Sequence, residues 1–379
     1  MGSIAPNSLP LLAVQEAVTK ARGLAMSEPH SHEPSNNRQD DSIGRIAELI
    51  GGDPMQRLDA DMKHVLDRLA DMGARPLELL SPEVARRQPR AAEAISAILG
   101  RQGRERPEDG VEAEDITITG AEGDLPGRVY RPLGLLSRLN PVVLYFHGGG
   151  FVTGDLDSHD ASARAIARRT GAIVVSVAYR LAPEHPFPAA HDDAWAAWRW
   201  LNQQVKALAG DKKRLALAGE DAGANLAAHV ALRARDGRGA QPVHQVLIHP
   251  IAGNDMTAAS YGETLRARPV GLPAMRWRFR QVFADEAASG DERINLVART
   301  DWAGLAPTTI VLAGIDPLRS EGEALADALE QAGVAVNCWT YEGVTQGFFG
   351  LGLVVTKALF AQSDTADALG KAFAPARHS

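Results

Sequence analysis

Short apolar runs alternate with helical stretches along the chain from about residue 115 onwards. Some runs, such as Val142–Phe146, are continuously apolar, as strands of a parallel sheet buried on both faces are. Helical stretches separate the later runs, so the pattern predicts an α/β fold: a mostly parallel eight-stranded sheet with helices on both faces. The expected strands are Asp115–Thr119, Gly127–Arg131, Val142–Phe146, Ile173–Ala178, Arg214–Ala218, Val246–His249, Thr309–Ala313 and Val334–Tyr341.

The residues before this alternation fall into two parts. Residues 1–45 are rich in Pro, Ser, Asn and His, a composition that predicts a flexible N-terminal extension. Residues 46–105 are expected to form N-terminal lid helices. Apolar residues recur at helical spacing from Met55 to Met72, and a second helix is expected from Ser81 to Ile98.

The core of the fold is expected over residues 106–379. Residues of about 254–300 interrupt its alternation and contain Trp277 in an aromatic-rich helical stretch. An insertion at this point of the chain lies at the carboxyl ends of the strands, where open α/β sheets bind ligands. The sequence therefore predicts that this insertion completes a helical lid.

Composition and charge exclude some classes of protein. The net charge is −7, and phosphate binding needs a basic stripe, so nucleic acid is not an expected partner. The start of the chain has no signal-peptide pattern and no run of 18 apolar residues occurs, so we expect no membrane contact and, by default, a cytoplasmic protein. His30 and His32 in a flexible polar tract make too weak a pair for a metal site.

A glycine-rich loop follows the expected strand Val142–Phe146. It reads His-Gly-Gly-Gly-Phe over residues 147–151. Glycines allow a sharp turn that directs backbone N–H groups into a pocket. We expect Gly148 and Gly149 to donate to a developing oxyanion.

A second motif follows the expected strand Arg214–Ala218. Residues 219–223 read Gly-Glu-Asp-Ala-Gly and open a helix of small residues. This is the context of a nucleophile elbow, whose central residue projects above the sheet. The central residue here is Asp221, and the N–H of Ala222 is the expected third oxyanion donor. Two late loops, each after an expected strand, carry Asp316 and Gln346.

With the Tyr-Arg-Leu-Ala-Pro-Glu-His-Pro segment at 179–186, these motifs identify a family. Over roughly residues 55–360 the chain resembles the hormone-sensitive-lipase-like esterases, or bacterial family IV esterases, which have the α/β-hydrolase fold. The resemblance implies short-to-medium acyl esters as substrates, no cofactor, and a homodimer. It implies that Asp316 is the catalytic acid. It also implies that Asp221 replaces the family's serine nucleophile and that Gln346 replaces its catalytic histidine.

The last two positions change the expected chemistry. A carboxylate is a poor acyl nucleophile that would give an anhydride, and glutamine cannot carry a proton. Ordinary serine-esterase activity is therefore not expected. An aspartate nucleophile occurs in relatives similar to haloalkane dehalogenases, but a tryptophan follows it there and a histidine splits the intermediate. Ala222 and Gln346 stand at those positions here.

Three hypotheses remain open. In the first, crowded carboxylates at Asp221, Asp316 and Glu220 raise one another's pKa, and Asp221 catalyses a non-hydrolytic acid–base reaction of a small carbonyl or acyl compound: an elimination, isomerisation or cyclisation. Gln346 would bridge Asp316 to Asp221 or to the substrate. In the second, the chain is an inactive, receptor-like binding protein, as the similar gibberellin receptors lack the catalytic histidine. In the third, it hydrolyses esters by an unusual route or has an engineered triad.

Further residues are weaker candidates for the substrate pocket. Phe151, Trp277 and Phe348 are considered as its lining, although aromatic residues at such spacing also occur in plain core. Glu220 is expected to hydrogen-bond backbone beneath the elbow. His249 is considered as a base, and a position in the core or in the pocket wall is the favoured interpretation.

Overall fold

The structure is a computed structural model that describes residues 53–103, 110–134, 139–237 and 240–374. The predicted flexible extension, residues 1–45, lies outside the described residues. No helix in the described part of the chain combines the length and the apolar character needed to cross a bilayer.

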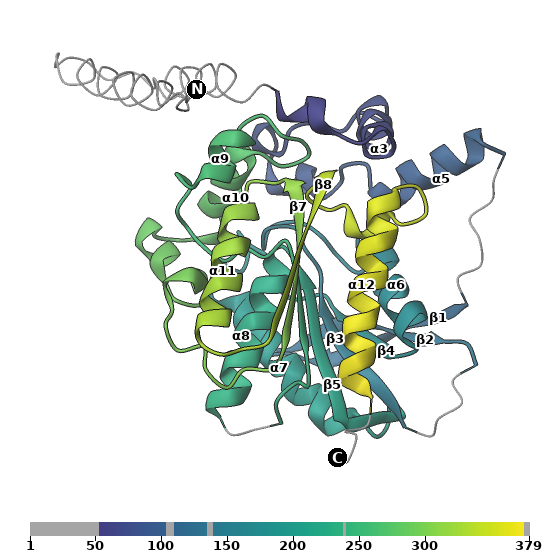
Figure 1. The fold of residues 1–379 in the computed structure, drawn as a ribbon, viewed down its shortest axis with the longest axis vertical. Helices are drawn as coiled ribbons and strands as arrows, with labels where there is room; N and C mark the ends of the chain where they lie inside the picture. Colours follow the sequence, from purple (N-terminus) through teal and green to yellow (C-terminus); the bar gives the residue numbers. More distant parts are fainter. Residues whose placement is uncertain (1–52, 104–109, 135–138, 238–239, 375–379) are drawn as a thin grey trace, which may run out of the picture. The chain divides into compact units, whose positions relative to one another are not determined.

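The centre of the fold is a sheet of eight strands in the order β1-β2-β4-β3-β5-β6-β7-β8 (Figure 1). The β1–β2 and β2–β4 pairs are antiparallel, and all other neighbours run parallel. The predicted mostly parallel eight-stranded sheet is confirmed, with several strands longer than expected. The strands are β1 Val111–Thr119, β2 Asp124–Pro132, β3 Asn140–Phe146, β4 Ile173–Val177, β5 Gly210–Glu220, β6 Gln245–Ile248, β7 Thr308–Ile315 and β8 Val336–Thr345.

Both faces of the sheet are buried, as the continuous apolar runs predicted. In β3 the side chains alternate: Val142 and Leu144 belong to the core on one face, and Val143 and Tyr145 to the core on the other. Helices therefore cover both faces, with α6 and α12 on one side (Figure 1). The helices of the core are α6 Asp160–Thr170, α7 Ala189–Gln204, α8 Ala222–Asp236, α11 Arg319–Gln331 and α12 Thr356–Phe373.

The helices before the sheet differ in part from expectation. The first begins as a short 3-10 turn, η1 Pro54–Arg57, and continues as α3 Ala60–Asp71. The expected single helix from Ser81 to Ile98 is wrong: it is two helices, α4 Pro82–Ala85 and α5 Ala91–Arg101. Pro89 causes the break, because a proline inside a helix lacks a donor and clashes with the preceding turn.

The insertion between β6 and β7 consists of short helices joined by irregular segments. It contains α9 Ala259–Glu263, α10 Leu272–Val282 and two 3-10 turns, η3 Glu286–Gly290 and η4 Leu296–Ala298. Trp277 on α10 is buried and donates from Nε1 to the carbonyl oxygen of Leu80, 3.0 Å away. This bond joins the insertion to the N-terminal helical segment. Trp277 does not line the pocket described below, so its predicted pocket role is wrong.

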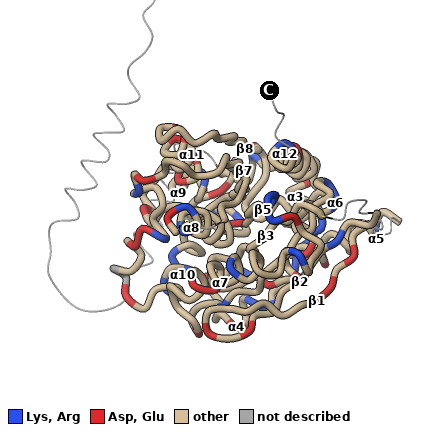
Figure 2. Tube along the Cα trace, turned by 90° about the horizontal axis from the view of Figure 1, so that it is seen from below, with Lys and Arg blue, Asp and Glu red and all other residues tan. Residues whose placement is uncertain are grey.

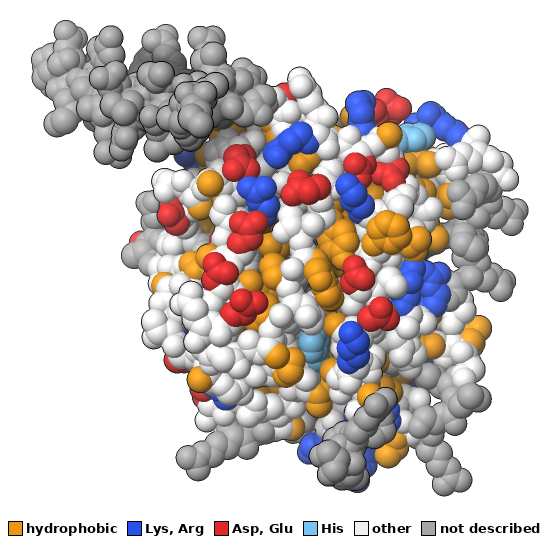
Figure 3. Space-filling view, in the orientation of Figure 1, with side chains coloured by type: hydrophobic (Ala, Val, Ile, Leu, Met, Phe, Trp, Pro, Cys, Tyr) orange, Lys and Arg blue, Asp and Glu red, His pale blue; other side chains and the backbone are white. Residues whose placement is uncertain are grey.

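Charges of both signs are interspersed over the described surface. Basic and acidic residues alternate along the trace in Figure 2 rather than separating to opposite sides. The face in Figure 3 likewise shows acidic and basic side chains beside one another. The surface in these views therefore has no extended region of one sign.

Candidate active site

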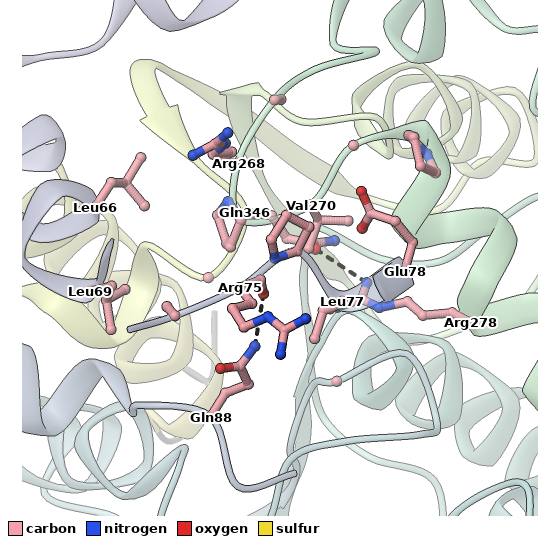
Figure 4. A pocket seen from close by; sticks show the side chains of 18 of the residues that line it. Leu66, Leu69, Arg75, Leu77, Glu78, Gln88, Arg268, Val270, Arg278 and Gln346 are labelled. Carbon is pink, nitrogen blue, oxygen red and sulfur yellow. Dashed lines mark hydrogen bonds between the residues drawn. The ribbon is translucent and has the colours of Figure 1, made fainter. Parts of the chain in front are cut away.

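The loops at the carboxyl ends of four parallel strands converge on one cavity of about 510 Å³ (Figure 4). Gly149 follows β3, Asp221 follows β5, His249 follows β6 and Gln346 follows β8. Helix α3, the segment before α4 and the insertion supply the walls. The apolar side chains among these are Leu66, Leu69, Pro76, Leu77, Leu265, Pro269, Val270 and Pro273.

The turn from β5 to α8 has the backbone geometry of a nucleophile elbow. Asp221 has φ 54° and ψ −115°, in the positive-φ region that few non-glycine residues adopt. The glycines on either side are required by space. A Cβ at Gly219 would overlap the backbone of Gly223, and a Cβ at Gly223 would overlap the carbonyl oxygen of Phe146 on β3. The predicted elbow is therefore present, with Asp221 at its apex.

One oxygen of the Asp221 carboxylate accepts two backbone hydrogen bonds and forms an ion pair with Arg278. Oδ2 lies 3.0 Å from the N–H nitrogen of Gly149, 2.9 Å from that of Gly150 and 3.2 Å from Nη1 of Arg278. Oδ1 is buried without a hydrogen-bond partner. The glycine loop therefore directs two backbone donors at the elbow, as an oxyanion hole does, and an oxygen of Asp221 occupies them.

The pair of donors differs from the predicted one. Gly149 is confirmed as a donor into the site, but the N–H of Gly148 donates to Nε2 of His159 at 3.1 Å. The prediction for Gly148 is wrong, and Gly150 is the second donor. Gly149 has φ 116° and Gly150 φ 60°, values that turn their N–H groups toward the elbow. Ala222 begins α8 directly after Asp221, and its role as a third donor stays a prediction.

Sequence reasoning missed Arg278. Its guanidinium extends from α10 into the site, and the residue is 4% exposed. Nη1 donates to Oε1 of Gln346 at 3.2 Å and forms the ion pair with Asp221. A signal was available in the sequence: Met275, Arg278 and Val282 share one buried helix face at helical spacing. A charged residue in such an apolar stripe indicates a buried partner.

Gln346 and Asp316 are not joined as the first hypothesis expected. Oε1 of Gln346 binds Arg278, and its Nε2 is buried without a partner. Oδ1 of Asp316 accepts from the N–H of Leu318 at 2.9 Å, while Oδ2 has no partner. Burial raises the pKa of Asp316 to about 6. Asp316 does not line the cavity, and Gln346 is connected to Asp221 through Arg278.

Glu220 forms a charged pair beside the cavity. Tyr145 donates its hydroxyl to Oε1 at 2.6 Å, and Nε2 of His249 lies 3.6 Å from Oε2. Burial raises the pKa of Glu220, but the interactions with His249 and His159 outweigh it and lower that pKa to about 2. Burial lowers the pKa of His249, yet Glu220 and the nearby aspartates raise it overall. The expected backbone partner of Glu220 is therefore wrong, and the expected position of His249 in the cavity wall is confirmed.

The two remaining aromatic candidates belong to the core. Phe151 stacks on His191 with ring centroids 5.5 Å apart, and Phe348 packs against Tyr341 at 5.7 Å. Neither lines the cavity, so both pocket predictions are wrong. Among the residues that the structure describes, no three His, Cys, Asp or Glu side chains are grouped to hold a metal ion.

Several known proteins similar to this chain are named as esterases. The family model that matches residues 143–350 is described as the α/β hydrolase fold. The esterase LipI of Mycobacterium tuberculosis is 40% identical over 247 residues, 64% of this chain and 77% of that protein. The ethyl acetate hydrolase of Pseudomonas putida is 35% identical over 286 residues, 75% of this chain and 88% of that protein.

A solved structure extends the likeness to most of the chain. The hyperthermophilic esterase of Pyrobaculum calidifontis superimposes with a TM-score of 0.74 at 34% identity, over 83% of this chain and 98% of that one. Its sequence and structure are similar to those of carboxylic ester hydrolases. The chain belongs to the α/β-hydrolase fold family.

Proposed function

We propose that this esterase-like protein binds a small acyl or carbonyl compound in its cavity and lacks serine-esterase activity. Asp221 stands at the position of the family's nucleophile, and Gln346 at that of its histidine. One observation carries the proposal: Oδ2 of Asp221 accepts from the N–H groups of Gly149 and Gly150 and forms an ion pair with Arg278. The carboxylate therefore occupies the place in which a hydrolase holds the oxyanion of its tetrahedral intermediate.

This arrangement opposes ester hydrolysis in two ways. A substrate carbonyl must displace a charged oxygen from two amides and a guanidinium before it can be polarised. Attack on the carbonyl must then come from a carboxylate whose charge is already shared among those donors. Gln346 supplies no base to activate water in its place.

The cavity itself suits a ligand. Its volume of about 510 Å³ lies within the range of roughly 300–1,000 Å³ that small-molecule sites occupy. Apolar walls surround a few polar groups at the floor, which is the usual composition of such sites. An acyl or carbonyl compound fits this combination.

A second candidate is acid–base catalysis through the other oxygen of Asp221. Oδ1 is buried and has no partner, so it is available to accept a proton from a bound carbonyl compound. The donors on Oδ2 weaken Asp221 as a base, and for this reason the candidate ranks second. Deuterium exchange at the carbon next to the carbonyl, followed by NMR in D2O, tests it: exchange must disappear in Asp221→Asn.

Hydrolysis of p-nitrophenyl acetate and butyrate tests the main proposal. We expect no turnover above background for the protein as it is. The triple variant Asp221→Ser/Arg278→Met/Gln346→His restores the triad and removes the arginine that loses its partner, and we expect it to gain turnover. Hydrolysis by the unaltered protein that is lost in Asp221→Ala would refute the proposal.

A further inference from the structure

The cavity is basic although the chain is acidic. Among its lining residues are four arginines and only two acidic residues, Glu78 and Asp221, whereas the net charge of the whole chain is −7. Asp221 pairs with Arg278 at the floor. The other three arginines, Arg75, Arg266 and Arg268, are exposed and lie at the opening; Arg266 has a partner of its own, which leaves Arg75 and Arg268.

We propose that the cavity binds a medium-chain hydroxylated carboxylic acid. Its carboxylate lies at the opening between Arg75 and Arg268, and its hydroxyl lies at the floor between Gln346 and Asp221. The inference rests on the proposed binding function and names the class of ligand for that same cavity.

The two arginines at the opening are available to an anion. The structure gives the guanidinium groups of Arg75 and Arg268 no ion-pair partner among the described residues. The backbone carbonyl of Arg75 accepts from Nε2 of Gln88 at 2.8 Å, which fixes the loop that carries it. In Figure 4 the side chains of Arg75 and Arg268 lie among those that line the cavity, and Arg278 enters from α10. A guanidinium binds a carboxylate through two parallel N–H groups.

The polar groups at the floor of the cavity are complementary to a ligand group that both accepts and donates a hydrogen bond. Arginine is only a donor, so the atom of the Gln346 amide that binds Arg278 is its oxygen. The amide nitrogen, Nε2, therefore remains as a donor for another group. That Nε2 is buried and lacks a partner, and Gln346 is one of the residues that line the cavity. Oδ1 of Asp221 is likewise buried and lacks a donor. Buried polar groups are nearly always paired, and one ligand hydroxyl pairs both.

The wall between opening and floor is apolar. Leu66 and Leu69 of α3 face the cavity with Leu77 and Val270 (Figure 4). A hydrocarbon segment between the two polar ends of the ligand buries its surface against these side chains. The three regions together describe an amphiphilic acid rather than a neutral ester.

Calorimetric titration of the full-length protein with three probes tests the inference. The probes are 10-hydroxydecanoate, its methyl ester and decanoate. We expect the hydroxy acid to bind about fivefold more tightly than the ester, as two solvent-exposed charge contacts support, and more weakly as salt rises. We also expect it to bind more tightly than decanoate, which leaves Gln346 and Asp221 without their partner.

Charge variants separate the opening from general effects. Arg75→Ala/Arg268→Ala is expected to remove the preference for acid over ester, and Glu78→Gln to increase it, because Glu78 repels an anion in the same cavity. Arg168→Ala, an exposed arginine on α6 away from the cavity, is the matched control and is expected to leave the preference unchanged.

The outcomes distinguish this inference from the proposed function. If the unaltered protein binds acid and ester equally, the inference that the opening binds a carboxylate is wrong, but the proposed binding function stands. A preference for the acid that survives in Arg75→Ala/Arg268→Ala leads to the same conclusion. If neither compound binds, the inference and the proposed binding function fail together. Hydrolysis of the methyl ester by the unaltered protein contradicts the proposed loss of esterase activity.

Discussion

We expect removal of either partner of the Arg278–Asp221 ion pair to destabilise the fold, and removal of both to have little effect. Asp221 is 2% exposed and Arg278 is 4% exposed, so removing one charge leaves the other buried. Loss of one member of a buried pair costs about 3–5 kcal/mol. Because two backbone amides still bind Asp221, we expect Arg278→Met to lower the free energy of unfolding by about 3 kcal/mol, at the lower end of that range.

Removing both charges is expected to recover most of this loss. Asn at position 221 tolerates the positive φ and keeps an acceptor for the two amides. Asp221→Asn/Arg278→Met should therefore unfold within about 1 kcal/mol of the unaltered protein, since buried ion pairs are often replaceable as a unit. Urea unfolding measures all the variants, with exposed Arg280→Met on the same helix as the control. A double variant as unstable as Arg278→Met alone would refute the reasoning.

The remaining predictions concern single residues. Burial raises the pKa of Asp316 to about 6, so ionisation of this side chain destabilises the folded state as the pH rises from about 4 through 6. Between pH 4 and 7.5 the free energy of unfolding of Asp316→Asn, measured in urea, should increase by roughly 3 kcal/mol relative to that of the unaltered protein. An unchanged difference between the two proteins would contradict this effect of burial. Gly223→Ala should lower the free energy of unfolding by about 3 kcal/mol, because its Cβ overlaps a carbonyl of β3, whereas Gly262→Ala meets no atom within 4 Å and serves as control. Trp277→Phe loses the bond to Leu80 and should cost about 1 kcal/mol, with a loss below a few tenths contradicting the link between α10 and the N-terminal segment.

The fold was predictable because its causes lie within short segments. Continuous apolar runs predicted strands buried on both faces, and the side chains of β3 alternate between two cores as expected. The elbow was predictable for a similar reason, since Gly219 and Gly223 are required by local backbone contacts. The helix break at Pro89 was visible in the sequence as well, because proline disrupts a helix interior wherever it occurs.

The details of the site depend on contacts between distant segments. Which glycine amides face the elbow is decided by the turn of the whole loop and by His159, which takes the N–H of Gly148. The partner of Asp221 comes from α10, 57 positions along the chain, and only its place in an apolar stripe marked it. Aromatic residues such as Phe151 and Phe348 fill the core on either face of the sheet, and composition alone cannot separate core from pocket.

Asp221, Arg278 and Gln346 form one electrostatic unit. A carboxylate at the apex of the elbow finds two amide donors in the glycine loop, but a buried charge also needs a counter-charge, which Arg278 supplies. The buried guanidinium of Arg278 in turn needs a hydrogen-bond acceptor, and Oε1 of Gln346 accepts from its Nη1. A neutral histidine there would offer a single nitrogen acceptor, and a protonated one would repel the guanidinium. Asp221 and Gln346 are therefore linked through Arg278, and a change at either one alters what the other two residues must balance.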